Sequence, residues 1–192
     1  MKKIFVSFLV LAIPFSSIVY ALENEKNYLE KAQKTSKELL GSLKKQLTNA
    51  LENKDTVQAV VVCSSIAQDI AKNISDNNNL NIKRVSLKNR NINGKPDEFE
   101  TKNLELFDKL NLEKKITPEY DTYSIVEEKD NKYFRYMKPI ITAKSCLQCH
   151  GEKETIKEAV KKVLFEKYPK DTAFGYKEGD IRGAVSVKIK LM

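Results

Sequence analysis

One histidine stands in this sequence of 192 residues, and it directly follows two cysteines that are separated by two residues. The segment reads Cys146-Leu147-Gln148-Cys149-His150 and lies late in the chain. A chain with a single imidazole cannot by itself build a bis-histidine haem site, a histidine-rich zinc site or a copper site with two histidines. These three kinds of metal centre are therefore excluded within one chain.

The C-x-x-C-H pattern itself is typical of covalent haem attachment. Two thiols at this spacing can add to the two vinyl groups of one porphyrin, and the adjacent histidine is then held beneath it, where it ligates iron. We therefore expect Cys146 and Cys149 to bind one haem c, with His150 as an axial ligand. Two alternatives remain: a dithiol or disulfide module, and a structural Cys3His zinc site that adds Cys63.

The second axial ligand cannot be histidine, so the candidates are Cys63, Met137, Met192, a lysine and water. Cys63 is the cysteine left over by the motif, and an unpaired thiol in an oxidising compartment needs protection, which ferric iron would provide. An inert buried thiol or an intermolecular disulfide would explain Cys63 equally well. Met137 lies in a strand-like segment that could bury it as an ordinary core residue.

The N-terminus has the pattern of a secretory signal peptide. Lys2 and Lys3 precede an apolar run over residues 4–15, and small or branched residues stand at 19–21. We expect residues 1–21 to be cleaved near Ala21, which leaves a single domain over 22–192 in the periplasm. The apolar run is shorter than the roughly 20 residues needed to span a bilayer, so we expect no stable membrane insertion after cleavage.

The chain has a net charge of +8, but its lysines are interleaved with glutamates along helix-like segments. This arrangement is typical of solvated helix faces, so we expect no nucleic-acid partner. The positive charge would instead help to steer an acidic redox partner toward the protein.

Hydrophobic periodicity predicts helices and strands in alternation. Apolar residues recur at helical spacing over 29–51 and from Thr56 to about residue 73, where two apolar stripes indicate burial on more than one side. Further helices are expected from Pro96 and over about 152–167, with strands over 82–87, 122–128, 132–141 and around 185–191. This order fits an α+β domain, with an antiparallel sheet and flanking helices.

Four segments together match the pattern of a known family: residues 59–63, residues 84–100, residues 146–151 and residues 168–184. Within them stand Ala59-Val60-Val61-Val62-Cys63, Arg84-Val85-Ser86-Leu87-Lys88-Asn89-Arg90-Asn91 and Arg182-Gly183-Ala184. Over about residues 25–190 the chain therefore resembles the exported single-haem c-type proteins with a PAS-like fold, which occur alone in the periplasm and as sensor modules. Ile92 and Gly94 stand where that family usually has proline and asparagine.

The resemblance implies a PAS-like antiparallel sheet with flanking helices and a long N-terminal helix. It also implies haem attachment at Cys146 and Cys149, with His150 as the proximal ligand and Cys63 as the distal ligand. A thiolate offsets the charge of ferric iron, so such a haem has a low potential.

Arginine side chains are candidates to pair with the haem propionates, because a guanidinium binds a carboxylate through two parallel hydrogen bonds. Arg84 and Arg90 are the favoured candidates, Arg182 is a third, and Tyr168 and Tyr176 are expected near the haem edge. The predicted function is low-potential electron transfer with a redox partner protein, or redox or diatomic-gas sensing. We do not expect an enzyme, because the only histidine is already the proximal ligand and peroxide cleavage needs a distal base.

Overall fold

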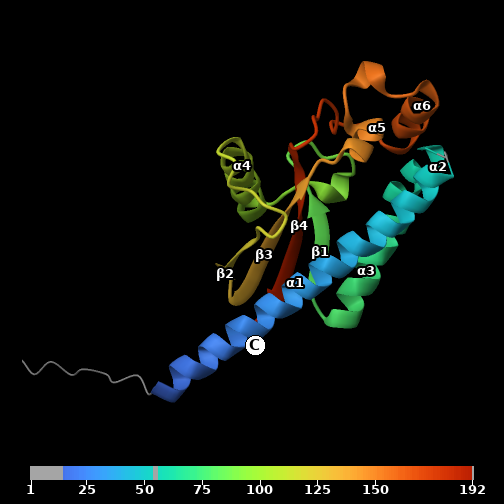
Figure 1. Ribbon diagram of the computed structural model, residues 1–192. Helices are drawn as coiled ribbons and strands as arrows, with labels where there is room; N and C mark the ends of the chain where they lie inside the picture. Colours follow the sequence, from blue (N-terminus) through green and yellow to red (C-terminus); the bar gives the residue numbers. More distant parts are fainter. Residues whose placement is uncertain (1–14, 54–55, 192) are drawn as a thin grey trace, which may run out of the picture.

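A computed structural model describes residues 15–53 and 56–191, in which helices surround an antiparallel sheet (Figure 1). Within these residues the sheet has four strands, in the order β1-β4-β3-β2. They are β1 (Asn81–Val85), β2 (Thr122–Glu128), β3 (Asn131–Ile141) and β4 (Ile181–Lys190). All neighbouring strands are antiparallel, and β2 and β3, which cover the strands expected over 122–128 and 132–141, form a hairpin. The structure thus confirms the predicted α+β class.

Helices lie on both faces of this sheet. The long helix α1 (Phe15–Glu52) crosses one face together with α3 (Ala67–Asn78), and α4 (Glu98–Leu112) lies on the opposite face (Figure 1). The expectation of a long N-terminal helix is thereby confirmed. The core on the α1 face includes Ala32, Leu39, Ile74, Phe134, Val185 and Val187. The core on the α4 face includes Val85, Leu104, Phe107, Met137 and Ala184.

Alternation along the strands explains the two cores, because successive side chains of a strand point to opposite faces. Phe134 and Val185 therefore reach the α1 face. Met137, three residues after Phe134, and Ala184, directly before Val185, reach the α4 face. The N-terminus of α4 is fixed by a capping box. The Asp97 carboxylate accepts a hydrogen bond from the Glu100 N–H, and the Glu100 carboxylate accepts one from the Asp97 N–H.

A smaller layer gathers at one end of the sheet. It contains α2 (Thr56–Val61), the motif helix α5 (Leu147–His150) and α6 (Glu158–Lys167) (Figure 1). Val60 of α2 packs there against Val160, Leu164 and Tyr168. This layer holds the cysteines and the histidine of the motif, so the functional residues lie at the end of the sheet rather than in either of the sheet's main cores.

Two predicted helices differ in detail from the structure. The helix from Thr56 continues to Asn78, five residues beyond the expected end, and Asn79 stops it by adopting a left-handed conformation with φ 47°. The helix expected over 152–167 is divided into a 3-10 turn, Lys153–Thr155, and α6. Between them Ile156 has an extended backbone and is 3% exposed in the core beside α6, so burial of this side chain interrupts the helix.

The predicted signal peptide falls mostly on residues 1–14, which lie outside the described residues, as does Met192. Helix α1 runs without a break from Phe15 through Ala21 to Glu52, and cleavage near Ala21 stays a prediction. In the described part of the chain, no helix combines the length and the apolar character needed to cross a membrane.

Candidate functional site

The C-x-x-C-H motif begins where β3 ends. Lys144–Cys146 form a 3-10 turn and Leu147–His150 form the single helical turn α5. Gly151 follows the histidine, and a Cβ atom on this residue would lie 2.7 Å from the carbonyl oxygen of Leu147. Because real Cβ atoms do not approach an oxygen so closely, the tight exit from the motif requires glycine.

A loop far along the chain, residues 171–180, clamps the motif through its backbone. The N–H of Tyr176 donates to the carbonyl of His150 at 3.0 Å, and the N–H of Gly175 donates to the carbonyl of Gly151 at 2.9 Å. Gly175 has a φ of 73°, which favours glycine. The sequence indicated only a turn-rich loop here, and its contact with the motif is made by backbone atoms that leave no side-chain signal.

The imidazole of His150 is oriented by the same loop. Its Nδ1 lies 2.9 Å from the carbonyl oxygen of Ala173, so Nδ1 carries the proton and Nε2 carries the lone pair. Burial lowers the pKa of His150 well below 6.5, and the positive charges of Arg182 and Arg90 act in the same direction. The ring is therefore neutral at pH 7, and a backbone carbonyl that fixes the tautomer is the usual support of a metal-ligating histidine.

Cys149 packs against the side-chain cluster that contains Val60, and Val60 precedes Cys63 by three residues on the same helix. The pKa of the Cys149 thiol is raised to about 11, chiefly by burial; Arg90 opposes this shift, and the charges of Cys63 and Cys146 add to it. All three cysteines therefore belong to this end of the fold. Each of them is a free thiol in the structure, so the dithiol alternative is not present as a disulfide.

The zinc alternative needs three or four ligating side chains around one ion. Among residues 15–53 and 56–191, no group of three or more histidine, cysteine, aspartate or glutamate side chains is arranged to hold a metal ion. The cluster around His150 therefore does not form the Cys3His set. A haem iron needs only two protein ligands, because the porphyrin supplies the other four.

Three arginines surround the cysteines and the histidine. Burial lowers the pKa of the Arg84 guanidinium, and the nearby Cys63 opposes this shift. Arg182 comes from β4, and its Nε atom is buried without a hydrogen-bond partner in the described structure. Positive charge from both groups acts on His150. A haem group would bring two propionates to this region, so the surplus of guanidinium groups fits the cofactor that the motif implies.

Arg90 hydrogen-bonds groups of the protein itself, whereas the sequence predicted a haem propionate as its partner. Its Nε donates to Asp171 Oδ2 at 2.7 Å, and its Nη2 donates to the carbonyl oxygens of Cys149 at 2.6 Å and Ala173 at 3.3 Å. The side chains of Arg90 and Asp171 are 10% and 5% exposed. Arg90 thus ties the motif to the loop over residues 171–180, and its predicted contact with a propionate stays a prediction.

The two tyrosines expected near the haem edge both lie at the cluster. Tyr168 packs beside α6 in the cluster that also contains Val60 of the helix that carries Cys63. The ring of Tyr176 meets the His150 ring edge-on, with centroids 6.2 Å apart. Met137, by contrast, is fully buried with Leu104 in the core beneath α4, where it acts as a core side chain.

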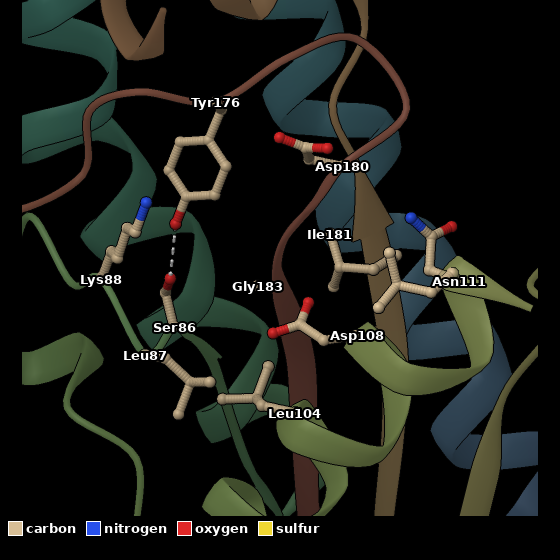
Figure 2. A pocket seen from close by; sticks show the side chains of 11 residues that line it. Ser86, Leu87, Lys88, Leu104, Asp108, Asn111, Tyr176, Asp180, Ile181 and Gly183 are labelled. Atoms are coloured by element: carbon tan, nitrogen blue, oxygen red, sulfur yellow. Dashed lines mark hydrogen bonds between the residues drawn. The ribbon is translucent and has the colours of Figure 1, made fainter.

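A separate hollow of about 290 Å³ adjoins Tyr176 (Figure 2). Figure 2 shows the Tyr176 hydroxyl pointing at the Ser86 hydroxyl, 3.3 Å away, while Asp108 and Asp180 lie across the hollow. Burial and the nearby charge of Asp180 raise the pKa of Asp108. No residue of the C-x-x-C-H motif lines this hollow, so it is a neighbour of the cysteine and histidine cluster and not its interior.

Comparison with known proteins assigns the family. A family model described as Tll0287-like matches residues 16–190, and the chain therefore belongs to the Tll0287-like family. A solved structure, that of the cyanobacterial heme-protein Tll0287, superposes with a TM-score of 0.63 and 24% sequence identity, covering 94% of this chain and 98% of that chain. At this identity the likeness shows the fold. No curated protein matches the chain.

Proposed function

We propose that this protein is an exported c-type cytochrome with one haem bound covalently through Cys146 and Cys149. His150 and Cys63 are its two axial ligands. The observation that carries the proposal is a C-x-x-C-H turn whose histidine is already oriented and neutral, and whose Cys149 packs against the helix that carries Cys63. Membership of the Tll0287-like family and the likeness to a cyanobacterial heme-protein support haem as the cofactor.

The protein's own residues hold and tune the cofactor. Ala173 fixes the His150 ring through Nδ1, which leaves Nε2 free to hold iron, and Arg90 anchors the Cys149 backbone. Arg84 and Arg182 bind the propionates. When bound, haem supplies reversible one-electron chemistry and, if one axial position opens, binding of a small diatomic molecule. The thiolate of Cys63 offsets the ferric charge, which keeps the potential low.

Covalent attachment is tested first. Purified protein from a host with c-type haem maturation is treated with acidified acetone, and the protein is weighed by mass spectrometry. We expect the haem to stay with the polypeptide, and the Cys146→Ala and Cys149→Ala variants each to retain at most one thioether bond. Complete extraction of haem from the wild-type protein, or a metal analysis that finds zinc instead, would contradict the proposal.

Electron transfer and sensing are separated by carbon monoxide. Rapid binding of carbon monoxide to the dithionite-reduced protein indicates that Cys63 leaves the iron on reduction, as a sensor requires. A ferrous form that stays six-coordinate and excludes carbon monoxide indicates electron transfer with a redox partner protein. Peroxide turnover no faster than that of a free haem peptide is expected in both cases, because no second histidine is present.

Export is tested by fractionation and N-terminal sequencing. We expect the mature protein in the periplasm with Leu22 as its first residue. A cytoplasmic protein that retains Met1 or Lys2 would contradict this part of the proposal.

A further inference from the structure

The helix that carries Cys63 changes its geometry at that residue. Helix α2 ends at Val61, a π-helical turn η1 covers Val62–Ile66, and α3 resumes at Ala67. The N–H of Ala67 donates to the carbonyl of Val62, five residues earlier, which is the π-helical pattern. Cys63 is the second residue of this wide turn.

The wide turn allows one helix to pack in different cores along its length. Before it, Ala59 packs with Ala50 of α1, and after it Ile74 enters the core between α1 and the sheet. From Val62 onward the positions in these cores are 62, 66, 70, 71 and 74, and four of them follow a spacing of four residues. In a regular α-helix that spacing drifts by about 40° at each step, and a π-helical turn absorbs one such step. The packing therefore favours an extra residue at this point.

Two neighbouring hydroxyl groups stabilise the turn. Ser64 Oγ and Ser65 Oγ both donate to the carbonyl of Val61, at 3.2 and 3.1 Å. In a regular α-helix the Val61 carbonyl would accept the N–H of Ser65, four residues later. The π-helical register removes that donor, so the carbonyl needs another one. Ser65 is exposed, whereas Ser64 is half-buried.

We propose that Ser65, together with Ser64, is a positioning residue for the distal iron ligand. The two hydroxyls hold the π-helical turn, and the turn sets the Cys63 thiol beside the C-x-x-C-H motif. Without the hydroxyls the segment shifts toward regular α-helical register, which rotates Cys63 about the helix axis and weakens its bond to iron. This inference rests on the proposed function, in which Cys63 is the distal ligand.

The test compares Ser65→Thr with Ser65→Val in the ferric holoprotein. The two side chains have the same shape and the same β-branching, and only threonine keeps the hydroxyl. Imidazole competes with Cys63 for the distal position and is titrated by the change in the optical spectrum. We expect S65T to bind imidazole within twofold of the wild type, and S65V to bind it about fivefold more tightly than S65T, because one hydroxyl hydrogen bond shifts an equilibrium by about that factor.

Ser42 in α1 provides the matched control, since S42T and S42V change the same atoms in another helix. Equal imidazole affinities for S42T and S42V are expected, and Cys63→Ala must bind imidazole much more tightly than the wild type. If S65V and S65T bind imidazole equally while Cys63→Ala binds it tightly, the positioning role is refuted and the proposed ligand stands. If Cys63→Ala binds imidazole as the wild type does, both the proposed ligand and this inference are refuted.

Discussion

Arg90 and Asp171 form a buried ion pair that supports the loop holding His150. The Arg90 Nε atom is 2.7 Å from Asp171 Oδ2, and Asp171 Oδ1 accepts the N–H of Ala173 at 2.8 Å. The carbonyl of Ala173 in turn holds Nδ1 of His150. A change in either member of the ion pair is therefore expected to destabilise the fold and to loosen the orientation of the His150 ring.

The size of the expected loss in the free energy of unfolding follows from burial, because the side chains of Arg90 and Asp171 are both at least nine-tenths buried. Removing one member of a buried pair leaves the other charge without a partner, which costs about 3–5 kcal/mol. For a domain of this size a loss of 1 kcal/mol lowers Tm by about 2–4 °C, so Arg90→Gln alone is expected to lower it by roughly 6–20 °C. The double variant with Asp171→Asn leaves no buried charge and should recover about 2–3 kcal/mol of the summed losses.

A double-mutant cycle measures this coupling. Urea unfolding of the wild type, both single variants and the double variant gives four free energies, and their combination isolates the pairwise term. A coupling energy below about 0.5 kcal/mol, the size seen for exposed pairs, would refute the assignment of a buried, stabilising contact.

Three further changes are expected to alter stability. Gly183→Ala should destabilise the protein by about 1–3 kcal/mol in urea unfolding, because its Cβ would lie 2.3 Å from a carbonyl oxygen of β1. Lys188, aided by Arg135, holds the pKa of Glu128 below 4.5. The ionised Glu128 therefore stabilises the folded protein above pH 4.5, and this contribution is lost as the pH falls through the lowered pKa, which acid unfolding would detect. Arg135→Ala should cost about 3–5 kcal/mol by thermal unfolding, since it leaves the fully buried Glu100 with less compensating charge; a cost under 1 kcal/mol would contradict it.

Much of the fold could be predicted because its elements are periodic. The alternation around Phe134 and Val185 places strand residues on two faces. The helix expected from Pro96 begins two residues later, at Glu98, because Asp97 caps it. The π-helical turn could not be predicted in the same way. The sequence indicated two apolar stripes on the helix that carries Cys63. The helical register that buries both stripes depends on the positions of α1 and α6, which are fixed only in the folded protein.

The candidate site was predictable where it is local in sequence. Spacing alone singles out Cys146, Cys149 and His150, whereas Cys63 has several explanations from the sequence, and only the fold packs its helix against Cys149. The role of Ala173 is carried by a backbone carbonyl, which any residue type would supply. Arg90 was predicted to pair with a haem propionate, which stays a prediction, and its hydrogen bonds to Asp171 and to the motif backbone depend on a loop whose path the sequence does not specify.

The most direct test of the account is the optical spectrum of the ferric and dithionite-reduced protein, recorded beside that of Cys63→Ala. We predict that the ferric wild type has the spectrum of a low-spin haem with a thiolate ligand, and that these features vanish in the variant while the covalent haem remains. Identical spectra for the two proteins would contradict the account, because Cys63 would then be a core residue and another group, or none, would occupy the distal position.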